Sequence, residues 1–222
     1  MEEISFGLWV RDGAMGVGTL SFYVPSTGQI AALGHGISDY DLKELIDVDE
    51  GFLNLASIVS IKKGMKNDPG EIKGLLNERA SIGEIDLNTE CGIYGEYDEK
   101  CDLLKSRNEI LVASKNEIEE GPAKIYCAIE EDGIPREYDI NIVKISNLTG
   151  IKSKGMIIEV TDEELLKKTG GIIQGMSGSP IVQNGRFIGA VTHVYVNDPT
   201  RGYAIFGETM IEQLNLTSKS EV

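Results

Sequence analysis

Histidine, tryptophan and cysteine are scarce in this 222-residue chain, which has two, one and three of them. The three cysteines cannot all pair, and Cys91, Cys101 and Cys127 lack the C-x-x-C spacing of a zinc site. A single Cys91–Cys101 bridge stays open, although free thiols in a partly buried β-structure are favoured. We expect no metal and no other cofactor.

Long apolar runs and basic residues are also lacking. No stretch of about 18 apolar residues occurs, and the chain begins Met1-Glu2-Glu3, so we expect neither a membrane span nor a signal peptide in it. Lysine and arginine number 21 against 36 aspartates and glutamates, a net charge of −15. Because such a surface repels phosphate backbones, nucleic acid is excluded as an expected partner.

Glycine is plentiful, with 26 residues against 5 phenylalanines, and short β-type runs alternate with turn residues along the whole chain. This pattern predicts an all-β fold with few short helices. One helix is predicted over residues 162–168, with Thr161 as N-cap and Glu164 completing a capping box, and another over 209–214. Strands are predicted at 18–23, 29–33, 56–61, 83–85, 123–129, 138–145, 156–160, 181–183, 187–195 and 203–206. Hairpin turns are predicted at Asn184-Gly185 and at Asp132-Gly133.

The most informative motif is Gly175-Met176-Ser177-Gly178-Ser179-Pro180, which precedes an apolar strand. Glycines allow a tight bend in which the Ser177 hydroxyl projects toward the spot that the nearby amides also face. The amides of Gly175 and Ser177 would then form an oxyanion hole. The pattern predicts Ser177 as a nucleophile.

A serine nucleophile needs a base, and the chain offers only His35 and His193. His35 follows a predicted strand within Gly34-His35-Gly36, and its distance in sequence from Ser177 is close to that of the chymotrypsin template. An α/β-hydrolase elbow is disfavoured because Ser179 stands where that motif needs glycine. We therefore predict His35 as general base in a chymotrypsin-like double β-barrel.

Longer stretches resemble the SpoIVB family of sporulation peptidases. The resemblance rests on residues 168–181, 189–194 and 197–203, and on 7–12, 18–20, 33–36 and 90–95. It implies a serine endopeptidase that cuts a membrane-associated regulatory protein, and itself, in the signalling that triggers late sigma-factor processing. It also implies an extracytoplasmic place between the two forespore membranes and a membrane-anchored full-length protein. Family members carry a PDZ domain and a membrane segment, and neither is recognised in residues 1–222.

The acid of the triad has two competing assignments. The family pattern places an aspartate fifteen residues before the nucleophile, which is Asp162 here. The chymotrypsin template instead places the acid about a third of the way from histidine to serine, near Glu84 or Asp86. The direct residue match favours Asp162, although an acid at a helix start is also stabilised there without any catalytic role.

The substrate pocket is predicted at His193, with Ile173 and Gln174 before the nucleophile. Peptidases with a histidine in that wall often select Glu or Gln before the cleaved bond, and Lys167, Lys168 and Arg201 would make the cleft locally basic. The chain is predicted to be one peptidase unit, with an N-terminal barrel at 1–100, a C-terminal barrel at 110–215 and a connection within 96–108. The rival hypothesis is an idle peptide-binding regulatory domain.

Overall fold

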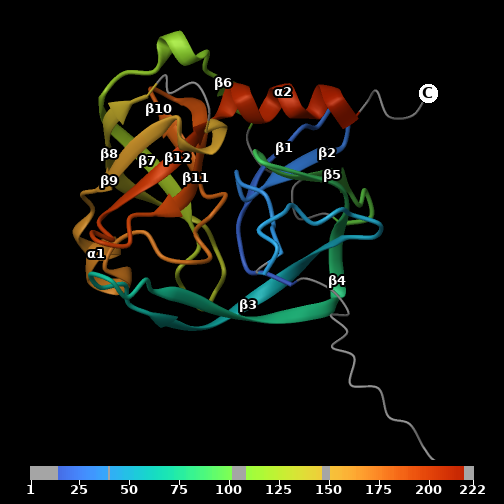
Figure 1. Cartoon of the computed structure of the whole chain (residues 1–222), viewed down its shortest axis with the longest axis horizontal. Helices are drawn as coiled ribbons and strands as arrows, with labels where there is room; N and C mark the ends of the chain where they lie inside the picture. Colours follow the sequence, from blue (N-terminus) through green and yellow to red (C-terminus); the bar gives the residue numbers. More distant parts are fainter. Residues whose placement is uncertain (1–14, 40, 102–108, 147–150, 218–222) are drawn as a thin grey trace, which may run out of the picture.

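The fold consists of two β units joined side by side (Figure 1). A computed structural model describes residues 15–39, 41–101, 109–146 and 151–217. The expected all-β fold is confirmed, and the resemblance motif at 7–12 lies outside the described residues. β5 ends at Tyr97 and β6 begins at Leu111, on either side of residues 102–108, which are also not described.

The N-terminal unit is a half-barrel of five antiparallel strands in the order β1-β2-β5-β4-β3. β1 and β3 lie at opposite edges, and no pairing between them is recorded in the described part of the chain. Its core is formed by buried side chains such as Ile30, Ile82 and Ile93. The strands are β1 (Leu20–Tyr23), β2 (Gln29–Ala32), β3 (Phe52–Lys62), β4 (Glu71–Thr89) and β5 (Gly92–Tyr97).

The C-terminal unit is a closed barrel. Six strands follow the order β10-β7-β8-β9-β12-β11, and pairing of β10 with β11 closes the ring, with β6 added beside β11. Closure leaves the ring without unpaired edges, and side chains such as Ile125, Met156 and Ile181 fill it. The strands are β6 (Leu111–Val112), β7 (Gly121–Cys127), β8 (Arg136–Ile145), β9 (Met156–Val160), β10 (Pro180–Gln183), β11 (Arg186–Val194) and β12 (Arg201–Phe206).

Two α-helices and two 3-10 turns complete the described chain. They are η1 (Lys115–Glu117), η2 (Lys152–Lys154), α1 (Glu163–Thr169) and α2 (Gly207–Thr217). α1 begins one residue later than predicted, because Asp162 rather than Thr161 is the N-cap and accepts from the Leu165 amide. The Asn184-Gly185 turn is confirmed: both residues have positive φ, at 51° and 72°, as a two-residue hairpin requires.

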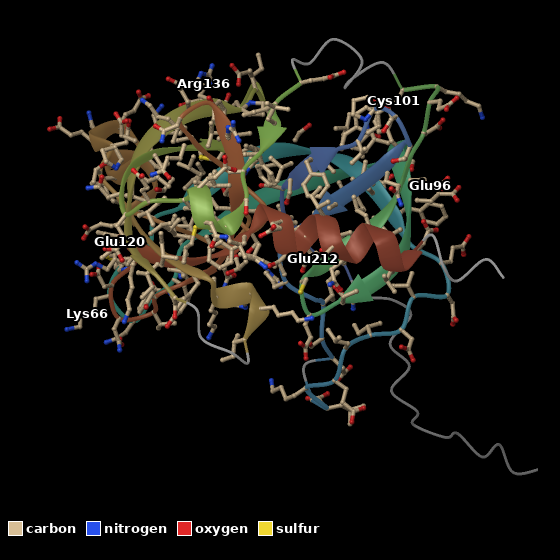
Figure 2. All side chains as sticks on the ribbon, turned by 90° about the horizontal axis from the view of Figure 1, so that it is seen from above. Lys66, Glu96, Cys101, Glu120, Arg136 and Glu212 are labelled. Atoms are coloured by element: carbon tan, nitrogen blue, oxygen red, sulfur yellow. The ribbon has the colours of Figure 1, made fainter. Side chains whose placement is uncertain are left out.

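A buried cluster and a long ribbon fix the two units against each other. Ala31 and Tyr94 of the half-barrel pack with Ala190 and Ile205 of the barrel and with Met210 of α2, which lies across the top of both (Figure 1). Below, the β3–β4 ribbon runs under both units. In Figure 2 its tip, marked by Lys66, lies at the opposite end of the molecule from Glu96 of the half-barrel.

Candidate active site

The loop between α1 and β10 carries Ser177 and is held from both units. The Gly178 amide donates to Val191 O (2.8 Å) and the Val191 amide to Ser179 O (3.0 Å), which fastens the loop to β11. From the half-barrel side, the Thr19 amide donates to Ser177 O (2.8 Å), and its hydroxyl donates to Gly175 O (3.2 Å). Ser177 therefore sits at the joint of the two units.

Two amides of this loop have no hydrogen-bond partner among the described residues. Met176 N donates to Ile173 O (3.1 Å) and Gly178 N to Val191 O, whereas no hydrogen bond between described residues uses the amides of Gly175 or Ser177. Gly175 adopts φ +99°, and an added Cβ would lie 2.9 Å from Cβ of Ile72 on the ribbon. These two amides are the ones predicted to form an oxyanion hole, and the loop leaves both available as donors.

The Ser177 hydroxyl donates to the carbonyl oxygen of Thr192 at 2.9 Å. Thr192 is the residue before His193 on β11, so the Ser177 hydroxyl points toward the strand that carries the second histidine. The Thr192 side chain turns the other way and donates to Ser153 O of η2 (2.7 Å). The sequence did not predict that Thr192 and Thr19 contact the Ser177 loop. A backbone carbonyl acceptor and a single threonine hydroxyl have no sequence motif by which they could be recognised.

His35 lies directly after β2, in a bend where Leu33 and Gly34 both have positive φ. Its Nδ1 is 3.0 Å from Gly36 O, so Nδ1 carries the proton there and Nε2 is left as the acceptor. The imidazole lies 4.8 Å, centroid to centroid, from the ring of His193. The fold thus brings His35 and Ser177 from distant parts of the chain to neighbouring residues of β11, at positions 192 and 193.

A cavity of about 320 Å³ opens beside these histidines. Burial, with His35 and Lys154 nearby, lowers the pKa of His193 to about 4, so this imidazole is neutral at pH 7. The residues that line this cavity include His35, His193, Lys43, Glu90, Lys152 and Ser153.

The residues predicted to flank the pocket occupy two environments. Ile173 is buried in the barrel core and packs against the ribbon near Gly70, whereas Gln174 is exposed. The Gln174 backbone exchanges hydrogen bonds with the ribbon, to Gly70 O (2.9 Å) and from Ile72 N (2.8 Å). The ribbon therefore supports the chain directly before Gly175.

Asp162 caps α1. One carboxylate oxygen accepts from the Leu165 amide (2.9 Å) and the other from the Asp139 amide (3.3 Å). Leu165 belongs to α1 and Asp139 to β8 of the barrel, and no hydrogen bond between Asp162 and His35 is recorded among described residues. Asp162 is not among the residues that line the cavity beside the two histidines.

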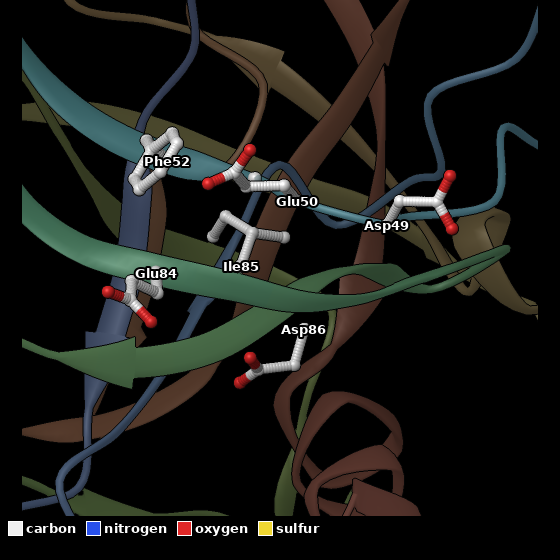
Figure 3. A pocket seen from close by; sticks show the side chains of 7 residues that line it. Asp49, Glu50, Phe52, Glu84, Ile85 and Asp86 are labelled. Carbon is white, nitrogen blue, oxygen red and sulfur yellow. The ribbon is translucent and has the colours of Figure 1, made fainter.

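The alternative acids, Glu84 and Asp86, line a different and smaller cavity of about 140 Å³ on β4. Asp49 and Glu50 share it, and the four carboxylates do not converge on one point (Figure 3). Over the described residues, no group of three or more His, Cys, Asp or Glu side chains could hold a metal ion. Cys91, Cys101 and Cys127 are all unpaired thiols.

Two of the three basic residues expected near the cleft, Lys168 and Arg201, are engaged in ion pairs. Lys168 pairs with Glu130 and Glu164, which raises the pKa of the lysine above its usual value. Arg201 pairs with Glu159 at 3.0 Å. Lys43 and Lys152 are the lysines that line the cavity instead.

The sequence model of the family described as SpoIVB peptidase S55 matches residues 2–211. No curated protein matches. No helix of the described residues is long and apolar enough to cross a membrane.

Similar solved structures overlap the chain in part. The Rv3671c protease of M. tuberculosis in its active form is 15% identical, with TM-score 0.42, over 61% of this chain and 63% of that one. An HtrA-type protease, AlgW with decapeptide, is 14% identical, with TM-score 0.43, over 84% and 51%. Human heparin binding protein is 12% identical, with TM-score 0.43, over 86% and 75%.

Proposed function

The chain belongs to the SpoIVB peptidase S55 family, and from this premise we propose that Ser177 and His35 cut a membrane-associated regulatory protein in sporulation signalling. Membership of this family makes the protein a serine endopeptidase whose substrate is a protein or peptide. Two contacts with β11 support the residue roles: the Ser177 hydroxyl donates to Thr192 O, and the His35 ring lies beside His193. In addition, the amides of Gly175 and Ser177 have no hydrogen-bond partner among the described residues.

Each residue has one task in the proposed mechanism. Ser177 Oγ leaves Thr192 O, attacks the substrate carbonyl carbon and gives its proton to Nε2 of His35. The amides of Gly175 and Ser177 donate to the oxyanion of the tetrahedral intermediate. The His35 imidazolium then protonates the leaving amine, and water attacks the acyl-enzyme by the same route in reverse. Gly36 O holds the ring in the required tautomer throughout.

Our proposal for the substrate and for the place of action goes beyond the family assignment. We place the reaction between the two forespore membranes, on a membrane-associated regulator, with cleavage of the protein itself as a further product. The family's sporulation role supports this proposal. Asp162, as the acid that orients His35, stays a prediction.

The test is incubation of the protein with a broad peptide library, and separately with extracytoplasmic segments of membrane-associated sporulation regulators from an endospore-forming bacterium. Mass spectrometry then maps the cuts. Cleavage of one regulator at a defined bond, and a size shift of the protein alone, are the expected results. Binding of these segments without any cut would instead support an idle peptide-binding domain.

His193 is predicted to determine specificity. Because its pKa is about 4, the neutral ring can donate one hydrogen bond to a substrate side chain at pH 7. We expect His193→Ala to lower kcat/KM for substrates with Glu or Gln before the cleaved bond by about 10- to 100-fold. Competing peptide substrates measured by mass spectrometry give this ratio.

The matched variant is His193→Gln, which keeps a donor and should retain part of the preference. Between pH 6 and 8 the preference of the parent should stay constant, since His193 takes up a proton only near pH 4. A cleavage-site profile that is the same for His193→Ala and for the parent would remove His193 from the substrate pocket.

A further inference from the structure

The short turn η2 forms one side of the cavity beside the two histidines. Lys152 and Ser153 of η2 and its N-cap Ile151 all line this cavity, and we call these three residues the η2 wall. The turn lies close on the barrel: a Cβ added to Gly155, directly after η2, would lie 2.4 Å from the ring of Phe206 on β12. The η2 wall therefore belongs to a different segment of the chain from His35 and Ser177, and its position relative to them needs a physical link.

The side chain of Thr192 supplies this link from β11. Its hydroxyl donates to Ser153 O at 2.7 Å, and no other hydrogen bond between η2 and β11 is recorded in the described part of the chain. Both residues are shielded from water, because Thr192 is 1% exposed and Ser153 9% exposed. Loss of the hydroxyl would leave Ser153 O as a buried acceptor without a partner, which is unfavourable enough to move the turn.

Two other parts of Thr192 contact the reacting groups. Its carbonyl oxygen accepts from the Ser177 hydroxyl (2.9 Å), and a Cβ added to Gly34, the residue before His35, would lie 3.0 Å from the Thr192 methyl group. The nucleophile, the loop of the base and the η2 wall thus all rest on one residue. A peptide bond that is cut lies between Ser177 and His35, so a neighbouring substrate side chain reaches the cavity that His35 lines.

We propose that the η2 wall binds a substrate side chain next to the cut bond, and that Thr192 is the positioning residue that holds this wall at the correct distance from Ser177 and His35. The inference rests on the proposed function, because it concerns the substrate of that reaction. Lys154, at the far end of η2, stacks over the Tyr203 ring at 4.7 Å and does not line the cavity. This contact keeps η2 on β12 when the Thr192 hydroxyl is removed, so the wall shifts while the fold is retained.

The experiment compares Thr192→Val, which keeps the methyl group and the carbonyl but loses the donor, with Thr192→Ser, which keeps the donor. Two substrates are used: a library peptide that extends to both sides of the cut, and the N-acetyl methyl ester of the residue before the cut. In Thr192→Val we expect kcat/KM to fall by about 30-fold for the peptide, mainly through a higher KM, and by only about 3-fold for the ester. Thr192→Ser should stay within about 3-fold of the parent for both.

Binding is measured without any cleavage in the Ser177→Ala protein, by fluorescence anisotropy of the same peptide carrying a dye. Adding Thr192→Val should raise the Kd by about 10-fold, and adding Thr192→Ser should leave it within about 2-fold. Hydrogen exchange followed by mass spectrometry should show faster exchange of residues 152–155 in Thr192→Val than in Thr192→Ser.

A control variant separates this role from a general loss of stability. The buried Gln183 side chain donates to Glu119 O (2.9 Å) and Pro122 O (3.1 Å), and none of these residues lines the cavity. Gln183→Met should therefore lower Tm at least as much as Thr192→Val while the peptide Kd stays within about 2-fold of the parent. An equal loss of affinity in both variants would overturn the proposal.

Because binding does not require activity, the two proposals fail separately. If the parent binds peptides without cutting them and Thr192→Val still weakens binding, the proposed function fails and the role of the η2 wall stands. If the parent cleaves and Thr192→Val changes neither the peptide KM nor the Kd, the η2 wall does not contact the substrate and the proposed function stands. If no peptide is bound or cut, both fail.

Discussion

Replacement of Ser177 by alanine is expected to lower kcat for peptide cleavage by about 10⁶-fold, to the background level, because no other hydroxyl takes its place beside the Gly175 and Ser177 amides. The fold should survive, since the substitution removes one hydrogen bond, to Thr192 O, at a cost of about 1 kcal/mol. Mass spectrometry of a peptide library after incubation with each protein measures the difference. Self-cleavage should disappear in the same variant.

Peptide binding is the control for this variant. Ser177→Ala keeps the cavity and the amides, so a bound peptide should be retained at an affinity close to that of the parent. Cleavage by Ser177→Ala at the parental rate would show that another residue is the nucleophile. Silence from both proteins, with binding intact, would favour the idle peptide-binding domain.

Replacement of Gly178 by alanine is expected to destabilise the protein by roughly 3 kcal/mol or more. Gly178 has φ +92°, and an added Cβ would lie 2.0 Å from Thr19 O and 2.6 Å from Leu33 N. Both contacts are backbone atoms of the other unit, so relief requires the joint between half-barrel and barrel to open. Urea denaturation gives the change in unfolding free energy.

Gly185 offers a matched control within the same chain. It also has positive φ, at 72°, but an added Cβ would find nothing within 4 Å. Gly185→Ala should therefore cost only about 1 kcal/mol, the strain of the backbone alone. Equal losses for the two variants would mean that the contact with Thr19 and Leu33 adds nothing to the strain.

Local sequence predicted the parts of the fold that depend on short-range preferences. The Asn184-Gly185 hairpin formed as predicted because both residues tolerate positive φ. The β3–β4 ribbon was predicted only over 56–61 and 83–85, whereas the strands run over Phe52–Lys62 and Glu71–Thr89. Bulges at Leu53, Asn54 and Ile58 shift the register and interrupt the alternation on which strand prediction relies.

The first residue of α1 also could not be predicted from the local sequence alone. Thr161 and Asp162 are both good N-caps, and the sequence alone favoured Thr161 because Glu164 stands three residues later. In the structure the amides of Thr161 and Asp162 both donate to Asp139 O on β8, which places Asp162 as the residue whose carboxylate meets the Leu165 amide. Pairing with a distant strand settled the position of the cap.

The sequence by itself determined the nucleophile loop and the shortlist of bases, because a Gly-x-Ser-Gly bend is a local property and only two histidines exist. Only the tertiary structure decided which groups surround them. Thr192 O and the Thr19 side chain come from other parts of the chain than the Ser177 loop, and strand pairing and the joint between the two units bring them to it. Such contacts depend on the register of long-range pairing, which no short stretch of residues encodes.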